Sequence, residues 1–81
     1  MRLGEALAAN VRSLRARNRW TQSELAEVLH ISQRAVSTLE SKAGRADVGI
    51  QELVDLCRAF DAPLVELLRG ADPADLRALG I

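Results

Sequence analysis

The chain has 81 residues, which is enough for one small domain and too few for a second module of enzyme size. Its formal net charge is zero, and a single cysteine, Cys57, excludes an internal disulfide, so a reducing cytoplasm is the expected compartment. No apolar stretch is long enough for a membrane span or a signal-peptide core. The only aromatic residues are Trp20 and Phe60, and the abundance of alanine and leucine predicts an all-α fold.

The charges are divided unequally between the two halves of the sequence. Residues 1–45 carry eight basic and four acidic side chains, a net charge of +4. Residues 46–81 carry three basic and seven acidic side chains, a net charge of −4. A basic half favours a nucleic-acid partner, and an acidic half limits non-specific attachment to a duplex.

A first amphipathic helix is predicted from about residue 3 to residue 17. Apolar side chains recur there at steps of three and four residues, at Leu3, Leu7, Val11 and Leu14. Basic side chains crowd the end of this segment, where cations suit the helix dipole.

Two closely spaced helix starts follow. Thr21 is a good N-cap, and Glu24 stands three residues later, as a capping box requires. Ser32 is the next good N-cap. The spacing predicts a helix over about 22–29, a tight turn, and a second helix over about 33–41.

The interior of this segment also predicts close packing of the two helices. Leu25, Val28 and Leu29 would form one apolar stripe, and Ala26 is small enough to let a second helix cross nearby. His30 falls in the turn, where histidine would tolerate a positive φ better than a branched residue.

The acidic half predicts two further helices and a tail. Apolar side chains mark the fourth helix at Ile50, Leu53, Val54, Cys57 and Phe60. Pro63 suits the first position of a fifth helix, which Gly70 would end. The tail begins with Asp72 as a cap and Pro73 behind it, which predicts one or two more helical turns.

The motif segment resembles the helix-turn-helix of lambda-type repressor and Cro proteins, the Xre family. The similar positions are Thr21-Gln22, Leu25-Ala26, Leu29, Ile31-Ser32, Gln33, Val36-Ser37 and Leu39-Glu40. The resemblance implies a compact five-helix DNA-binding domain over residues 1–70, with a short helical tail over residues 71–81. It also implies a sequence-specific transcriptional regulator, expected to be a repressor that binds a palindromic operator as a homodimer.

The resemblance assigns base reading to the second motif helix. Val36 and Leu39 must face the core, so the opposite side of that helix faces outward. The expected base-reading residues on it are Gln33, Arg34, Ser37 and Thr38. Glutamine can bond bidentately to adenine, arginine to guanine, and a threonine methyl can touch thymine, so Arg34 is the leading candidate for discrimination.

Phosphate contacts and a structural ion pair complete the expected site. By resemblance Gln22 bonds a phosphate and braces the recognition helix. The basic residues expected to contact phosphates are Arg12, Arg17, Arg19, Lys42 and Arg45. The family also pairs an arginine such as Arg15 with a glutamate such as Glu40. If that pair is buried, Glu40→Ala should destabilise the fold by about 3–5 kcal/mol.

Neither catalysis nor a cofactor is indicated by the sequence. No nucleophile with a base partner and no phosphate-cradling glycine loop is visible, and one histidine and one cysteine cannot form a metal site. A second hypothesis stays open, because the neutral total charge also suits a protein-interaction module. Such a module would be the antitoxin of a toxin-antitoxin pair, or a helical adaptor that binds a protein partner through its acidic half.

Overall fold

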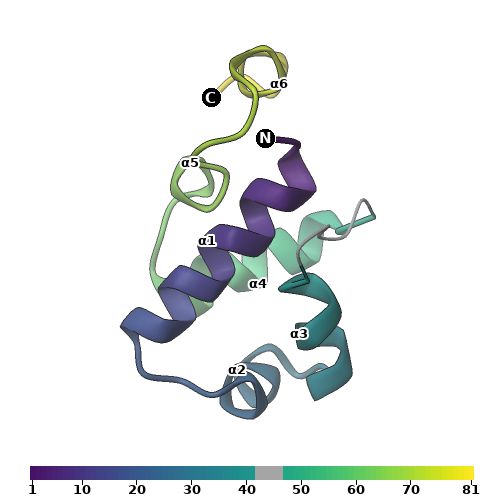
Figure 1. Cartoon of the computed structure of the whole chain (residues 1–81), viewed down its shortest axis with the longest axis vertical. Coiled ribbons are helices and arrows are strands. Elements are labelled where there is room, and N and C mark those ends of the chain that lie inside the picture. Colours follow the sequence, from purple (N-terminus) through teal and green to yellow (C-terminus); the bar gives the residue numbers. More distant parts are fainter. Residues whose placement is uncertain (42–46) are drawn as a thin grey trace.

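The computed structural model describes residues 1–41 and 47–81, and within these ranges the chain forms six helices and no strand. In chain order they are α1 (Leu3–Arg17), α2 (Gln22–Leu29), α3 (Gln33–Leu39), α4 (Ile50–Phe60), α5 (Leu64–Leu67) and α6 (Pro73–Ala78). Figure 1 shows α1 crossing the middle of the molecule, with α2 at one end and α6 and both chain termini at the other. The predicted all-α fold is confirmed.

The helix starts follow the predicted caps. The Thr21 hydroxyl accepts a hydrogen bond from the Glu24 amide (3.1 Å), and the Glu24 carboxylate accepts one from the Thr21 amide (3.0 Å). The Ser32 hydroxyl accepts from the Ala35 amide at 3.0 Å and so caps α3. Asp72 caps α6 in the same way. One detail differs from the prediction, because Pro63 is the N-cap of α5 and not its first helical residue.

Among the described residues, a left-handed residue that is not glycine follows α1, α2 and α4. These residues are Arg19, His30 and Asp61, with φ values of 58°, 57° and 50°. After α2, the His30 amide donates to the Glu27 carbonyl (3.2 Å) and the Ile31 amide to the Ala26 carbonyl (3.0 Å). This pair of bonds is a Schellman motif, which satisfies carbonyls at a helix end and turns the chain sharply toward α3. The structure thus gives His30 a positive φ, as the sequence allowed.

Replacing His30 by glycine is expected to raise the free energy of unfolding by about 1 kcal/mol, because the β-carbon in the left-handed region costs about that much. The His30 side chain is exposed, so little packing is lost with it. Urea unfolding measures the gain, and His30→Ala is the matched control because it keeps the β-carbon. An equal gain in both variants would mean that the imidazole, and not the backbone, is the source.

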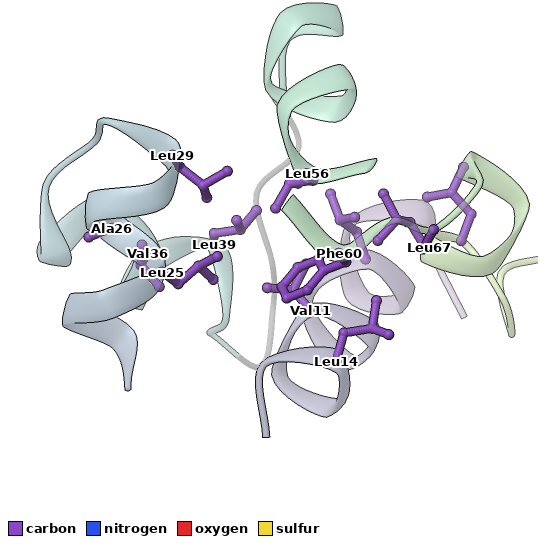
Figure 2. Packing of buried hydrophobic residues seen from close by; sticks show 13 residues of the cluster. Val11, Leu14, Leu25, Ala26, Leu29, Val36, Leu39, Leu56, Phe60 and Leu67 are labelled. Carbon is purple, nitrogen blue, oxygen red and sulfur yellow. The ribbon is translucent and has the colours of Figure 1, made fainter. Parts of the chain in front are cut away.

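The core joins all of α1 to α5. Its most deeply buried large side chains are Val11, Leu25, Val36, Leu39, Leu56 and Leu67. Figure 2 shows these groups meeting between α2 and α3 on one side and α1, α4 and α5 on the other. The Trp20 ring, just ahead of α2, lies against Phe60 of α4 with a centroid distance of 5.7 Å. Trp20 therefore packs the α1–α2 connection against α4.

Three apolar assignments from the sequence are wrong. Ile50, expected on the apolar face of the fourth helix, is 83% exposed at the start of α4. Val28 is 45% exposed and does not belong to the buried stripe of α2. Val54 is 37% exposed, whereas Leu56, which the sequence reading passed over, is 1% exposed. The sequence of α4 has apolar residues around more than half of its circumference, and the observed inward face is centred on Leu56 and Phe60. Cys57 is partly buried against this core, consistent with a small packing residue.

Asn10 joins α5 to α1 by side-chain hydrogen bonds. Its amide nitrogen donates to the carbonyl of Leu67 at 2.7 Å and to that of Arg69 at 2.9 Å. Both carbonyls lie at the end of α5, where helical partners are missing. Between α5 and α6, the Asp72 amide donates to the Met1 carbonyl at 2.8 Å, so this segment is joined to the N-terminus.

Among the described residues, no helix is both long and apolar enough to cross a bilayer.

Candidate nucleic-acid interface

The outer face of α3 is polar and open to solvent. Val36 is fully buried and Leu39 is 2% exposed, so these two side chains fix which way the helix faces. The opposite face presents the four side chains expected to read bases, all of them exposed: Gln33, Arg34, Ser37 and Thr38. The structure therefore brings together on one surface two long polar side chains and two short hydroxyls.

Glu40, the C-cap of α3, is the only charged side chain among the described residues that is buried. Its carboxylate accepts from Arg15 Nε at 2.7 Å and from Arg15 Nη2 at 3.0 Å, a bidentate ion pair between α1 and the end of α3. Arg15 Nη1 also donates to the Trp20 carbonyl at 2.8 Å. The hydrogen-bonded Glu40 carboxylate raises the pKa of Arg15, outweighing the opposing effect of desolvation, so the guanidinium stays charged.

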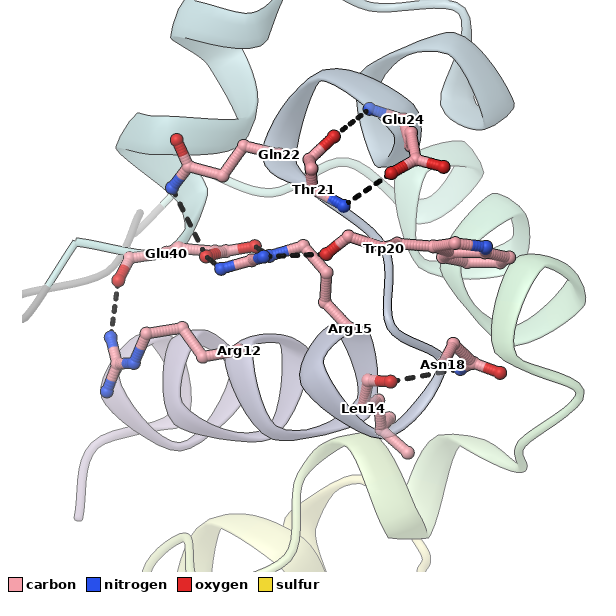
Figure 3. Close-up of polar contacts among 9 residues, drawn as sticks. All are labelled: Arg12, Leu14, Arg15, Asn18, Trp20, Thr21, Gln22, Glu24 and Glu40. Carbon is pink, nitrogen blue, oxygen red and sulfur yellow. Dashed lines mark hydrogen bonds and ion pairs between the residues drawn. The ribbon is translucent and has the colours of Figure 1, made fainter.

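Two expected phosphate-binding residues also reach Glu40. Gln22 Nε2 donates to Glu40 Oε1 at 3.3 Å, and Arg12 Nη1 donates to the Glu40 backbone oxygen. Figure 3 shows Arg12, Arg15 and Gln22 converging on Glu40 from α1 and from the start of α2. Each Gln22 or Arg12 bond uses one of several donors, so the same side chains keep further N–H groups for an anion. Glu40 thus ties the end of α3 to both α1 and α2.

Two of the remaining expected phosphate contacts are placed by the structure. Arg17 and Arg19 are exposed at and just beyond the end of α1. Lys42 and Arg45 lie outside the described residues, so the structure does not place them. Among the described residues there is no cluster of three side chains suited to holding a metal ion.

Two features of α3 escaped the sequence analysis. The Thr38 hydroxyl donates to the Arg34 carbonyl at 3.0 Å, one turn back along the helix. Ala35, half-buried, lies in an open concavity of about 310 Å³ that Ser32, Arg34 and Thr38 also line. The first feature could have been expected from the sequence, because a threonine inside a helix often donates its hydroxyl hydrogen to the carbonyl one turn earlier.

Comparison with known proteins agrees with this geometry. Residues 6–70 match the family model described as a helix-turn-helix domain, which takes in all the helices from α2 to α5 and most of α1. The chain belongs to the helix-turn-helix domain family. No curated protein matches the sequence significantly.

Solved structures similar to this helix-turn-helix domain are transcription regulators by title. The clp gene regulator ClgR from Corynebacterium glutamicum is 38% identical, with a TM-score of 0.73 over 96% of this chain and 79% of that one. A second ClgR structure is 39% identical, with a TM-score of 0.70 over 82% and 83% of the two chains. The hypothetical transcription factor NHTF from Neisseria is 26% identical, with a TM-score of 0.72 over 95% and 84%. Family and neighbours together support a DNA-binding transcriptional regulator.

Proposed function

We propose that this helix-turn-helix domain is a repressor that inserts α3 into the major groove and binds a palindromic operator as a homodimer. The observation that carries the proposal is the division of α3 into two faces: Val36 and Leu39 in the core, and a row of exposed polar side chains opposite them. A helix held in this way can present its outer face to base edges without unfolding any part of the core.

In this proposal, Glu40 and the side chains bonded to it, from Arg12, Arg15 and Gln22, set the angle of α3. Exposed cationic side chains set the register of the domain on the duplex. Arg15 and Gln22 hold Glu40 from two helices, so α3 cannot tilt without breaking several bonds. The exposed Arg17 and Arg19 side chains would neutralise phosphates, which fixes position without choosing sequence. Recognition and anchoring are then divided between different helices.

The homodimer is proposed from the symmetry that major-groove readers of this kind require. One α3 of seven residues reads only a few base pairs, so two copies on half-sites about one helical turn apart are needed for specificity. Candidate contacts between copies are the apolar side chains left exposed near the C-terminus, Leu79 (52%) and Ile81 (42%). Sedimentation equilibrium with and without the selected operator tests the stoichiometry, and one chain per palindrome would contradict the dimer.

The proposal is tested by selecting a binding site from random duplex DNA and then measuring affinity against salt concentration. Arg34→Ala is expected to reduce discrimination at one base pair by about 1–3 kcal/mol, because a bidentate contact to guanine is lost. Arg77→Ala is the matched control, since it removes an exposed arginine from α6 in the acidic part of the chain. Fluorescence anisotropy against single-base variants of the selected site gives both numbers.

Two results would contradict the function. One is no binding of any duplex at low salt, since phosphate contacts supply affinity whatever the sequence. The other is tight, salt-dependent binding in which no base substitution changes the affinity, which would leave a non-specific DNA-binding protein. Arg19→Ala separates the two kinds of contact, because losing a phosphate contact weakens all sequences equally and lowers the salt slope by about one unit.

A further inference from the structure

An open concavity of about 290 Å³ lies between the end of α2 and the outer side of α4. Its apolar part comes from Val28, Leu29 and Ala59. Val28 is 45% exposed there, although the other apolar side chains of α2 are buried. Two charged side chains of α4, Asp55 and Arg58, line the same concavity. The concavity therefore combines an apolar surface with one charge of each sign.

Asp55 and Arg58 lie on the same side of α4, because residues three apart are neighbours on a helix surface. The Asp55 carboxylate accepts a hydrogen bond from Gln51 Nε2 at 2.9 Å, which leaves its second oxygen for another donor. Within residues 1–41 and 47–81, the Arg58 guanidinium forms no hydrogen bond or ion pair, with Asp55 or with any other group. Both side chains can therefore pair with a ligand that carries the opposite charges.

The end of α2 favours a positive charge beside Asp55. The helix ends at Leu29, and its last carbonyls give that end a partial negative charge. His30, which follows, is exposed and completes the lining of the concavity. A narrower hollow shares Leu29 and Asp55 with the first and is also lined by Glu52, a second carboxylate. The cationic group of a ligand is therefore expected near Asp55 and its anionic group near Arg58, one helical turn further along α4.

We infer that this concavity is a binding site for a free apolar α-amino acid. The ammonium group pairs with Asp55 and the carboxylate with Arg58, while the side chain covers Val28, Leu29 and Ala59. Small-molecule sites have volumes of about 300–1,000 Å³ and add a few polar groups to an apolar lining, so a concavity at the lower end of this range suits so small a ligand. No residue of this lining belongs to the face of α3 expected to read bases. The inference thus goes beyond the proposed DNA binding and does not depend on it.

The test is a titration of the intact, isotope-labelled protein with leucine, followed by NMR. We expect a dissociation constant of about 1 mM, within reach of a ligand this small, and shifts of the amide signals of Val28, Leu29 and Ala59. Isoamylamine lacks the carboxylate and isocaproate lacks the ammonium group. Each is expected to bind about tenfold more weakly than leucine, the effect of losing one hydrogen bond to a charged group. Glycine keeps both charges without the apolar side chain and is also expected to bind at least about tenfold more weakly.

Two variants assign the binding to this concavity. Asp55→Asn is expected to weaken leucine about tenfold and to leave the affinity for isocaproate unchanged, because isocaproate has no ammonium group to lose a partner. Arg58→Gln is expected to weaken leucine to the same extent and to leave the affinity for isoamylamine unchanged. Asp61→Asn and Arg77→Gln are the matched controls, since both residues are exposed and neither lines the concavity.

Three results would overturn the inference. The first is a leucine titration without a saturable shift. The second is equal affinity for leucine and the two analogues, which would mean that the charges are not recognised. The third is leucine binding that both Asp55→Asn and Arg58→Gln leave at full strength, because the ligand would then lie elsewhere. The ligand series with the unmodified protein decides the question even if a variant folds poorly, and DNA binding measured without leucine is independent of all three results.

Discussion

Replacing Arg15 by methionine is expected to lower the free energy of unfolding by about 3 kcal/mol, because it leaves the Glu40 carboxylate buried without its ion-pair partner. The Glu40 side chain is only 2% exposed, so water cannot take the place of the guanidinium. Within residues 1–41 and 47–81, Gln22 alone would remain as a side-chain donor to it, at 3.3 Å. Chemical denaturation monitored by circular dichroism measures the loss.

The reverse change is expected to cost less. Glu40→Gln removes the buried charge and keeps an acceptor oxygen, and Arg15, whose side chain is 22% exposed, retains the Trp20 carbonyl and access to water. The loss in the free energy of unfolding therefore depends on which partner is removed, because an unpaired Glu40 is buried from water and an unpaired Arg15 is partly exposed. Equal losses from the two single variants would contradict this account of the site.

A double-mutant cycle and a matched control complete the test. Arg15→Met combined with Glu40→Met should recover most of the stability lost by Arg15→Met, because an apolar pair needs no charge compensation. Arg17→Met is the control: this arginine is exposed in the same helical turn, and surface substitutions usually change stability by less than about 0.5 kcal/mol. The double variant should nevertheless bind DNA less well, if Glu40 also sets the angle of α3.

The local chemistry of the helix ends was readable from the sequence. Thr21 with Glu24, and Ser32, act on amides no more than three residues away, so their hydrogen bonds need no information from the rest of the chain. The left-handed His30 is equally local, since two helix starts so close together require a sharp turn between them. The separation of Val36 and Leu39 from the polar face of α3 follows from helical periodicity alone.

The orientation of α4 was not readable in the same way. Its apolar residues include Leu53, Val54, Leu56 and Cys57, and this set fits more than one inward face. Which face is buried depends on where α2 and α5 lie, and that is settled by contacts between distant parts of the chain. The bracing role of Gln22 was predicted only from the family resemblance, because its bond to Glu40 spans eighteen residues and leaves no local pattern. Local patterns predict helices and caps, whereas long-range packing selects among faces.

Leu56→Ala tests which face of α4 is buried, and we expect it to lower the free energy of unfolding by about 3 kcal/mol. Leu56 is 1% exposed and packs in the core with Leu29, Leu39 and Phe60, so truncation removes most of a buried side chain and leaves a cavity. An 81-residue domain has a total stability of roughly 4–12 kcal/mol, so the variant should unfold at much lower urea concentration.

Val54→Ala is the matched comparison, two residues earlier in the same helix. Val54 is 37% exposed, so its truncation should cost less than about 1 kcal/mol and leave the urea midpoint nearly unchanged. If Val54→Ala proved the costlier change, α4 would pack through the face inferred from sequence periodicity, and the core built around Leu56 would be wrong. Because α2 and α4 pack together, a loss of stability at Leu56 should also reduce the fraction of chains able to present α3 to DNA.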